Sequence, residues 1–592
     1  MKKVLNLAGC LLLGALAAWA LPLTMALREP VEALTNSTAL LLVALAFALL
    51  IRRAERSGCL GVPEMVMGVI FSAMLVLGSE LCVRAEHAFT RARLPYQAVA
   101  ILSLSPGIAS LLALARQTLA KQTLAKRSPA RGSTGAHPFA FFLAMWAFIA
   151  LCYLPAWLAY FPAITSYDTG TQLSQIASGE YVSNHPLLHT GLLTLCIRAG
   201  GGGRMGVALY AFFQLLCLSS AFAYACFKLR VWGAPRMLWG SAALYFALWP
   251  THALLAVAIT KDVLFSALFL PTTLYVIEAL RDIDAFFRLR LPALRLVLSL
   301  AALCLLRHNG VAAVLALSVG LVIAFKGKRC RLIALCAAVL SLYGLMNMAL
   351  GSVLQASKGN GAVMLSVPAQ QIAAAVKSHP ERIDDEERGA LETLFDAECF
   401  ENYLPFFADP VKDHLHMDVL AEDPVKYAQV YLSIGRKCPG TYLSAALALN
   451  SGLWYPDNAA HANMYMKDGV GYVETIDYFT WPGETLDRPG WLPRVHAYYE
   501  AFASDGVYRR IGVLSILFAP GIYTWLLIAS TFLLCRVGRR RAVVALLPCW
   551  GLVPVLLLGP VINVRYVYPM MAAAPVMLAL LIGNPLKQEV AS

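Results

Sequence analysis

Residues 160–190 read YFPAITSYDTGTQLSQIASGEYVSNHPLLHT, a polar stretch that directly follows a long apolar run. That run, 138–160, contains no charged residue and is long enough to cross the ~30 Å hydrocarbon core of a membrane as a helix. A membrane helix followed at once by carboxylate, amide and imidazole side chains predicts a membrane protein that carries candidate chemistry on a surface loop.

The composition of the whole chain indicates the same class. Hydrophobic residues make up 59% of the 592 residues and charged residues only 14%, well away from the average of soluble domains. The formal net charge of +13 would favour nucleic acid as a partner of a soluble protein. Here the cations form short clusters between apolar runs, such as RRAER (52–56) and RVGRRR (536–541). Such clusters orient membrane helices, so we expect a lipid bilayer and no nucleic acid as a partner.

Apolar runs long enough to span a bilayer predict an all-α polytopic protein with about fourteen transmembrane helices. The runs lie at 4–27, 36–51, 61–83, 97–115, 138–160, 205–227, 237–257, 261–280, 293–306, 309–325, 331–353, 510–535, 542–560 and 566–584. With Lys2 and Lys3 in the cytoplasm, every basic cluster falls on the cytoplasmic side. Both termini are then cytoplasmic, in the cell (plasma) membrane. The first run is either a cleaved signal peptide or a retained helix, and the retained helix is favoured.

The same parity places the polar loops on the extracytoplasmic face. We expect four parts: an N-terminal four-helix membrane extension with a basic cytoplasmic linker (1–137), a membrane core with a first outer loop at 161–200 (138–354), an extracytoplasmic domain (355–509) and C-terminal transmembrane helices (510–592). The extracytoplasmic domain is predicted to be mainly helical, because DDEE (384–387) is typical of a helix start and RKCPG (436–440) of a helix end. DDEE lacks the ligand spacing of a calcium loop, which favours a solvated helix start.

Cys399 and Cys438 are the two cysteines of this predicted outer domain. Each lies beside a predicted helix, in a compartment where disulfides persist. A disulfide between them and a pair of buried thiols are both compatible with the sequence.

The stretch quoted first contains a candidate catalytic carboxylate. Asp168, Gln172 and Gln175 fall at i, i+4 and i+7, so they share one face of a helix. A carboxylate followed by amides suits a site that holds sugar hydroxyls and takes a proton from one of them, and Tyr167 can stack on the sugar ring. The alternative is a solvated loop with a helix cap, for which Ser166 and Asp168 are suitable residues.

His185 and His189 are spaced i, i+4, a spacing that can hold a metal ion on one helix face. No third ligand is evident, so hydrogen bonding at the membrane interface is the favoured interpretation. A divalent metal stays open, and the sequence indicates no other cofactor.

Charged residues also stand at the ends of later predicted spans. Lys261 and Asp262 begin one span, Arg307 interrupts a long apolar stretch, and Arg565 lies between two spans. A charge at that depth is costly and usually faces a functional cavity. A simple helix-end charge pair at Lys261–Asp262 and snorkelling of the arginines to the interface are the alternatives.

Taken together, these residues predict one site on the outer face. Lysine and arginine can hold a lipid phosphate and stabilise its charge as a glycosyl bond breaks, while Asp168 or Asp262 takes the proton of the attacking hydroxyl. The residues expected to bind substrate are Tyr167, Gln172, Gln175, His185, His189, Lys261, Arg307, Asn309, Arg565 and Tyr566.

Several motifs carry a resemblance. FPAITSYDTGTQLSQ, NHPLLHT, KDVLF, LLRHNG, KCPGTYLSAALALNSGLWYPD and RYVYP resemble, over 140–584, an uncharacterised family of bacterial multi-pass membrane proteins. That family is similar to the GT-C superfamily of membrane glycosyltransferases, which includes protein O-mannosyltransferases and uses polyprenyl-phosphate sugars on the outer face. The resemblance implies a GT-C-like fold, with Asp168 as the catalytic carboxylate and Arg565 as a contact of the donor phosphate.

The chain departs from the family pattern at several points. Ala163 stands where the pattern has Gly, one His of a His-His pair is missing, and no second acid lies directly beside Asp168. Residues 1–137 lie outside the resemblance and are interpreted as an appended module.

The leading hypothesis is therefore an inverting-type glycosyltransferase. It would move a sugar from a polyprenyl-phosphate-linked donor to an extracytoplasmic acceptor, which is a glycan, lipid or protein of the cell envelope. A transporter or flippase of a lipid-linked saccharide is the alternative, although such folds show related halves with paired broken helices, and no such symmetry is evident. A ligase or polymerase of surface glycan is a third, chemically close hypothesis.

Overall fold

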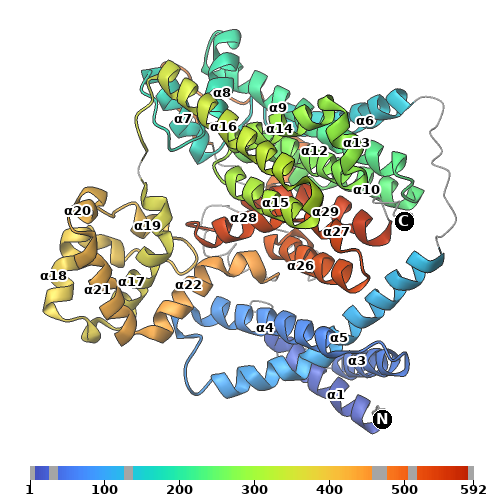
Figure 1. Ribbon diagram of the computed structural model, residues 1–592. Helices are drawn as coiled ribbons and strands as arrows, with labels where there is room; N and C mark the ends of the chain where they lie inside the picture. Colours follow the sequence, from blue (N-terminus) through green and yellow to red (C-terminus); the bar gives the residue numbers. More distant parts are fainter. Residues whose placement is uncertain are drawn as a thin grey trace.

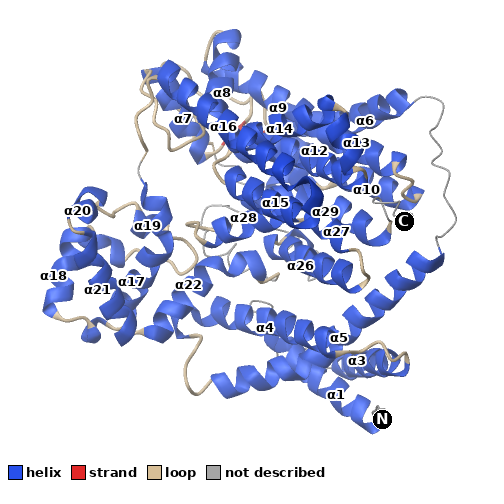
Figure 2. Cartoon of the chain, in the orientation of Figure 1, coloured by secondary structure: helices blue, strands red, loops and turns tan. Residues whose placement is uncertain are grey.

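A computed structural model of the chain describes residues 7–25, 38–125, 138–359, 361–456, 477–503 and 516–583. Regular structure in these ranges is almost entirely α-helical, with one sheet of two very short strands (Figure 1, Figure 2). This confirms the predicted all-α class. The two ends of the chain, which the predicted topology places in the cytoplasm, lie outside the described residues.

Within the ranges that the structure describes, eight helices are long and apolar enough to cross a membrane. They are α1 with η1 (Leu7–Thr24), α4 (Val62–Arg84), α5 (Leu94–Ala125), α6 (Pro138–Ala159), α9 (Gly203–Val231), α12 (Lys261–Arg281), η3 with α16 (Lys326–Leu354) and α29 (Val564–Ile582). A ninth arises if α10 (Arg236–Leu248) and α11 (Pro250–Val257), bent by 51° at Trp249, count as one broken span. The structure thus supports a multi-pass membrane protein with about eight membrane-length helices.

The remaining predicted spans are helical but shorter or more charged. They contain α3 (Thr38–Arg56), α14 (Arg290–Leu306), α15 (Gly310–Ala324), α26 (Pro520–Arg536), α27 (Arg540–Val544) and α28 (Leu547–Leu557). At 1.5 Å per residue, the 15 residues of α15 rise ~23 Å, less than the ~30 Å of a hydrocarbon core. The number of fourteen spans therefore stays a prediction.

Small residues bring the N-terminal helices α1, α3, α4 and α5 close together. A Cβ at Gly68 of α4 would lie 2.5 Å from the carbonyl oxygen of Ser105 in α5, so glycine permits this approach of the two backbones. Membrane helices often pack through such small residues, because lipid supplies no hydrophobic drive between them. These four helices form the lower body in Figure 1.

A buried charge ties this body to the C-terminal helices. Glu64, near the start of α4, is fully buried and pairs with Arg116 of α5 at 2.9 Å and Arg536 of α26 at 3.0 Å. A buried carboxylate requires such partners, since an isolated charge in a medium of low polarity is very costly. Glu64 therefore links residues that are 472 positions apart in the sequence.

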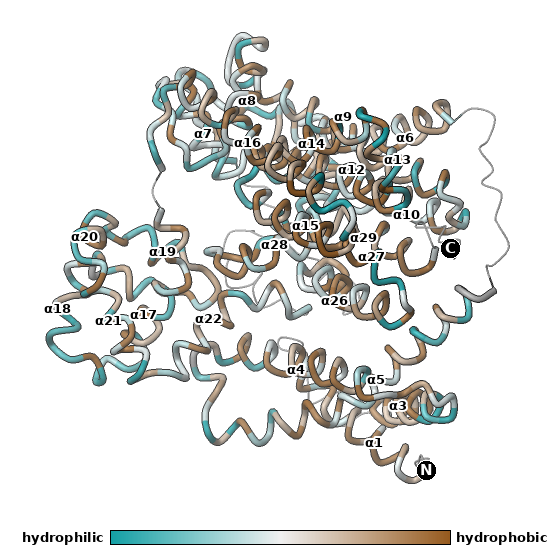
Figure 3. Tube along the Cα trace, viewed as in Figure 1, coloured by the Kyte–Doolittle hydropathy of each residue, from teal (hydrophilic) through white to brown (hydrophobic). Residues whose placement is uncertain are grey.

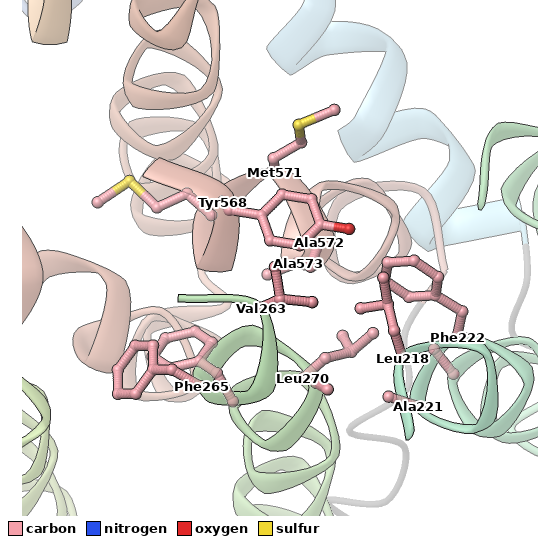
Figure 4. Close-up of a cluster of buried hydrophobic side chains, with 14 of the residues drawn as sticks. Leu218, Ala221, Phe222, Val263, Phe265, Leu270, Tyr568, Met571, Ala572 and Ala573 are labelled. Atoms are coloured by element: carbon pink, nitrogen blue, oxygen red, sulfur yellow. The ribbon is translucent and has the colours of Figure 1, made fainter. Parts of the chain in front are cut away.

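The central core is formed by α9, α12 and α29. Figure 4 shows Leu218 and Phe222 of α9 facing Val263 and Leu270 of α12, with Tyr568 of α29 above them. Of the membrane-length helices, α12 and α29 are the most buried, whereas α6 and α16 leave most of their apolar surface exposed. This distribution places α6 and α16 at the lipid-facing side of a multi-pass protein.

A second, smaller hydrophobic cluster forms in the chain after α16. Its helices are α17 (Ser366–Ser378), α18 (Asp385–Leu394), α19 (Asp409–Lys412), α20 (Met417–Glu422) and α21 (Pro424–Lys437). Their colours mix hydrophilic with hydrophobic residues, in contrast to the apolar helices of the central core (Figure 3). Asp384 caps α18 in a capping box with Glu387, so DDEE is a helix start as predicted. We call this cluster the outer unit.

The candidate disulfide between Cys399 and Cys438 is not formed, and both cysteines are free and buried. Each thiol is part of the apolar packing of the outer unit. Burial raises the pKa of the Cys399 thiol to about 12, as expected for a cysteine that behaves as a small hydrophobic side chain. Of the two arrangements that the sequence left open, the structure has the pair of buried thiols and not the disulfide.

Contacts at both ends join the outer unit to the membrane body. The backbone of Ser357, just after α16, exchanges hydrogen bonds with Tyr181 and Ser183 in the first polar loop, at 2.9 and 3.0 Å. At the other end, α22 (Pro439–Trp454) packs against α4 and α26. The outer unit thereby begins beside the loop that the sequence singles out.

Candidate functional site

Two short strands bring distant parts of the chain together at the candidate site. β1 (Ile164–Thr165) pairs in parallel with β2 (Ala258–Ile259). Each strand runs straight into a helix, β1 into α7 (Tyr167–Ser178) and β2 into α12. The first turns of α7 and α12 therefore lie side by side, which places Asp168 next to Lys261.

Hydroxyl groups fix both helix starts. Ser166, the N-cap of α7, donates to the carbonyl oxygen of Ile259 at 2.9 Å, and Thr169 donates to the same carbonyl. Thr260, the N-cap of α12, accepts the backbone N–H of Asp262 at 3.1 Å. The Thr260 cap satisfies an amide that has no partner inside the helix, whereas Ser166 and Thr169 tie the start of α7 to β2. The catalytic candidates consequently stand on anchored helix ends.

Asp168 lies between two cations. Its carboxylate is 2.6 Å from the Lys261 ammonium and 3.6 Å from the Arg565 guanidinium. Burial alone would raise the pKa of the Asp168 carboxyl, but Lys261, Arg565 and His185 outweigh it and hold that pKa well below its usual range. Asp168 is therefore ionised in this arrangement.

Asp262 is fully buried and has cations on two sides. It forms an ion pair with Arg307, and its other carboxylate oxygen is 3.9 Å from Arg565 and 3.0 Å from the Thr260 hydroxyl. Arg565 thus lies between the two carboxylates Asp168 and Asp262. The structure brings together all five charged residues that the sequence predicted for one site.

Tyr566 connects the two arginines. Its ring lies 4.8 Å from the guanidinium of Arg307 and 5.1 Å from that of Arg565, and its hydroxyl accepts a hydrogen bond from Arg565 at 3.3 Å. Arg307 ends α14, and Asn309 stands two residues on, at the N-cap of α15. Tyr566 holds both guanidinium planes in place, an arrangement that arginine favours over aromatic rings.

His185 extends the cluster to the first polar loop. Its Nδ1 is 3.3 Å from the Lys261 ammonium. Burial, followed by the charge of Lys261, lowers the pKa of His185 to about 4, so the ring is neutral at pH 7 and accepts a hydrogen bond from Lys261.

His189 is placed differently. It is fully buried in α8 (Leu187–Gly200), with its ring 5.3 Å from that of Tyr210. In the described parts of the chain no group of three or more His, Cys, Asp or Glu residues is placed to hold a metal ion. Among those residues, His185 and His189 therefore have no third ligand beside them.

Gln172 and Gln175 point away from the charged cluster, into the packing of α7. The Gln172 amide donates to the Thr190 hydroxyl at 2.7 Å, and the Gln175 oxygen accepts the backbone N–H of Val182 at 3.4 Å. Both side chains are buried. The shared helical face predicted for them exists, but it faces α8 and the following loop.

Tyr167 remains at the surface, where 63% of it is exposed. Its ring meets Tyr478 edge-on, with the ring centres 5.5 Å apart. Tyr478 belongs to residues 477–492, which cross over α7 and which we call the strap. An exposed aromatic pair beside Asp168 is suited to stacking on a flat or ring-shaped ligand.

The strap and His308 were missed by reasoning from the sequence. Asp477 accepts the backbone N–H of Thr165 at 3.0 Å and pairs with Arg488, which also donates to the carbonyl oxygens of Tyr160 and Ala163. The contacts with Thr165, Tyr160 and Ala163 join residues more than 300 positions apart, so no local pattern predicts them.

His308 lies close enough to Lys261 for that charge, after burial, to lower its pKa. Its position directly after Arg307 is the one signal in the sequence.

The charged cluster has three cations against two carboxylates, so it keeps a net positive charge. A phosphate can enter such a site without reversing its charge balance, and arginine binds phosphate oxygens in pairs. Asp168 stands at the rim of this positive region and can take a proton from a neighbouring hydroxyl.

No curated protein and no solved structure matches this chain. One family model does match, over residues 181–590, and its description is a family of unknown function, DUF6020. The matched range covers well over half of the chain and includes Lys261, Asp262, Arg307 and Arg565, while Asp168 lies before it. The chain therefore belongs to the DUF6020 family.

Proposed function

We propose that this protein is a membrane glycosyltransferase of GT-C type. In this proposal it transfers a sugar from a polyprenyl-phosphate-linked donor, held at the outer leaflet of the cell membrane, to an extracytoplasmic acceptor. The observation that carries the proposal is the cluster in which Asp168 and Asp262 share Lys261, Arg307 and Arg565.

The cations suit the donor. Arg307 and Arg565 are both largely buried and are oriented by the Tyr566 ring, so they offer fixed donors to a phosphate. When the bond between the anomeric carbon and the phosphate oxygen breaks, the electron pair leaves with the phosphate. Preorganised cations stabilise that developing charge without reorganising.

Asp168 suits the acceptor. The oxygen of an acceptor hydroxyl forms the new bond to the anomeric carbon, and its proton passes to Asp168. A carboxylate held by Lys261 at 2.6 Å is a weak base, because its pKa is far below neutral. The donor phosphate competes for the same cations and offsets their charge, which raises the pKa of Asp168. Donor binding would thereby turn Asp168 into a stronger base only when a sugar is in place.

The test is Asp168→Asn, which keeps the size of the side chain but cannot take a proton. Turnover should fall by about 10²–10⁴-fold while binding of the polyprenyl-phosphate donor is largely kept. Glu180→Gln is the matched control, because it removes a carboxylate from the exposed loop after α7. It should leave turnover unaltered. Near-normal turnover of Asp168→Asn in membranes that contain the donor would falsify the assignment.

A transporter of lipid-linked saccharide is the second candidate, and one observation favours it. The span formed by α10 and α11 is broken by 51° at Trp249 and leads through β2 into Lys261, as a discontinuous helix leads into a substrate site in many transporters. In the described residues it is the one broken pair, whereas transporters built from repeats have two. Movement of intact donor across vesicles without release of polyprenyl phosphate would favour the transporter.

A further inference from the structure

Four consecutive glycines, 200–203, connect α8 to α9, and the site described above does not use them. Gly201 has a φ of +70°, in the left-handed region that suits glycine. A Cβ at Gly200 would lie 2.6 Å from the backbone nitrogen of Gly206. These two glycines serve the tight turn between the helices.

Gly202 and Gly203 serve a different contact. A Cβ at Gly202 would lie 2.5 Å from a carboxylate oxygen of Glu484, and a Cβ at Gly203 would overlap the indole of Trp481. Glu484 accepts the backbone N–H groups of Gly203 and Arg204 at 2.9 and 2.6 Å. The strap therefore packs directly on the backbone of this turn, which only glycine leaves uncovered.

The strap forms one side of an open cavity of about 340 Å³. The cavity is lined by Ile176 of α7, by Tyr181, by residues of α8, and by Trp481 and Glu484 of the strap. The cavity is at the small end of the ~300–1,000 Å³ typical of ligand pockets. It is separate from the charged cluster, but α7 connects the two, since Ile176 is eight residues after Asp168, or ~12 Å along the helix.

We propose that this cavity binds one sugar ring of the acceptor, at a distance from Asp168 that a short oligosaccharide spans. This inference rests on the proposed transferase function. A sugar ring has apolar C–H faces and a rim of hydroxyls. Tyr181 and Trp481 offer flat apolar surfaces with a polar tip, while Glu484 accepts and Arg198 donates hydrogen bonds at the rim.

The lining argues against other occupants. The carboxylate of Glu484 offsets the single arginine of the lining, Arg198, so an anion gains little there. The volume of about 340 Å³ accommodates a single sugar ring. The exposed pair Tyr167 and Tyr478 lies on the same helix and strap, at the Asp168 end of α7. A chain of sugars held at the cavity and extended along α7 would meet this pair beside the base.

The experiment is saturation-transfer NMR on the full-length protein in a detergent without a sugar headgroup. The probes are methyl glucoside, methyl mannoside and methyl N-acetylglucosaminide. At least one should give saturation transfer with the wild type and equally with Asp168→Asn. Trp481→Ala should weaken binding of that probe at least tenfold. Arg198→Met changes an exposed side chain of α8, so it should weaken binding of the same probe without disturbing the strap.

Trp491→Ala is the matched control, because Trp491 is also in the strap but packs on Phe161, away from the cavity. It should leave the signal unchanged. No transfer from any probe with the wild type, or full transfer retained in both Trp481→Ala and Arg198→Met, overturns the proposal. Sugar binding that depends on Trp481, together with normal turnover of Asp168→Asn, would keep this site and reject the transferase assignment.

Discussion

Lys261 and Asp168 are 93 residues apart in the sequence, yet the ammonium of one lies 2.6 Å from the carboxylate of the other. The contact arises because the strands β1 and β2 pair in register and each leads directly into a helix. Lys261 is the first residue of α12, where the helix dipole disfavours a cation. A lysine in that unfavourable position is held by Asp168 and by the neutral ring of His185, so the ion pair also fixes the start of α12.

Lys261→Met tests this relationship through the pH dependence of turnover. Of the charges that lower the pKa of Asp168, Lys261 has the largest effect. Its removal should therefore raise that pKa. The acid limb of the kcat/KM profile, which reports the free enzyme, should therefore move to higher pH, whatever happens to the maximal rate. Lys358→Met, at an exposed position after α16, should not move the limb. An acid limb unchanged by Lys261→Met would mean that Asp168 is not the group that titrates.

Arg565 contacts both carboxylates and should also hold the donor phosphate. Arg565→Ala should weaken binding of a polyprenyl phosphate by roughly 1.5–3 kcal/mol, the range for a lost charge-assisted hydrogen bond, which is about 10- to 150-fold in Kd. Arg565→Lys keeps the charge but loses the paired donors, so it should recover only part of this affinity. The measurement is equilibrium binding in nanodiscs, with Arg236→Ala, at an exposed residue of α10, as the control. Unchanged affinity in Arg565→Ala would assign Arg565 to anchoring at the interface.

Much of this fold is predictable because long apolar runs must become helices in lipid, where every backbone amide needs an internal partner. The charges at or just beyond the ends of those runs, Asp168, Lys261 and Arg307, stand out beside the apolar sequence and mark the site. The pairing of β1 with β2 was not predictable, since two-residue strands carry no periodic signal.

Long-range packing accounts for the other misses. Gln172 and Gln175 share a face with Asp168 as expected, but which neighbour covers that face depends on α8. Glu484 contacts the glycine turn across 281 residues of sequence, and whether Cys399 and Cys438 bond depends on how the outer unit packs around them.

Glu64 should be essential for attachment of the N-terminal helices. Glu64→Gln removes the charge that pairs with Arg116 and Arg536 and leaves two guanidinium groups with a neutral partner. Removing one partner of a buried ion pair costs about 3–5 kcal/mol of stability. Because both arginines are partly exposed, we expect Glu64→Gln to lower the free energy of unfolding by about 1–3 kcal/mol. Thermal unfolding in detergent measures the loss. Glu386→Gln, on the exposed side of α18, is the control and should change the free energy of unfolding by less than about 0.5 kcal/mol. If both substitutions lowered stability equally, the ion pairs of Glu64 would not be what holds the N-terminal helices.

The predicted topology places the linker after α5 and the outer unit on opposite sides of the membrane. Cysteine introduced at Glu392 in α18 should react with a membrane-impermeant maleimide in intact cells. Cysteine at Lys121 in α5 should react only after permeabilisation. Both positions are exposed, and the background should carry Cys330→Ser and Cys535→Ser, because these two native thiols are exposed as well. Labelling of both positions from the same side would remove the basis for a shared outer face.

The outer unit should respond to pH through Asp396, whose carboxylate bridges His414 at 2.8 Å and His416 at 3.0 Å. The hydrogen bonds from His414 and His416 lower the pKa of Asp396 from its usual 3.8. The contribution of Asp396 to stability is therefore present above pH 3.8 and is lost as the pH falls through the lowered value.

The pKa of His416 is raised from 6.5, first by its hydrogen bond to the carbonyl oxygen of Thr393 and then by Asp396. Its contribution is full below pH 6.5 and is lost as the pH rises through the raised value. The bridge should therefore be tightest in mildly acid solution.

Hydrogen exchange measures this directly, because the amides of Asp396 and His416 bond to His414 and Leu394 across the same two segments. Exchange at these two amides should be slower at pH 6 than at pH 8 after correction for the intrinsic rate. In Asp396→Asn most of that difference should vanish, while the amide of Arg388 in α18, bonded to Asp384, should show none in either protein. A difference that persists in Asp396→Asn would place the pH response elsewhere in the outer unit.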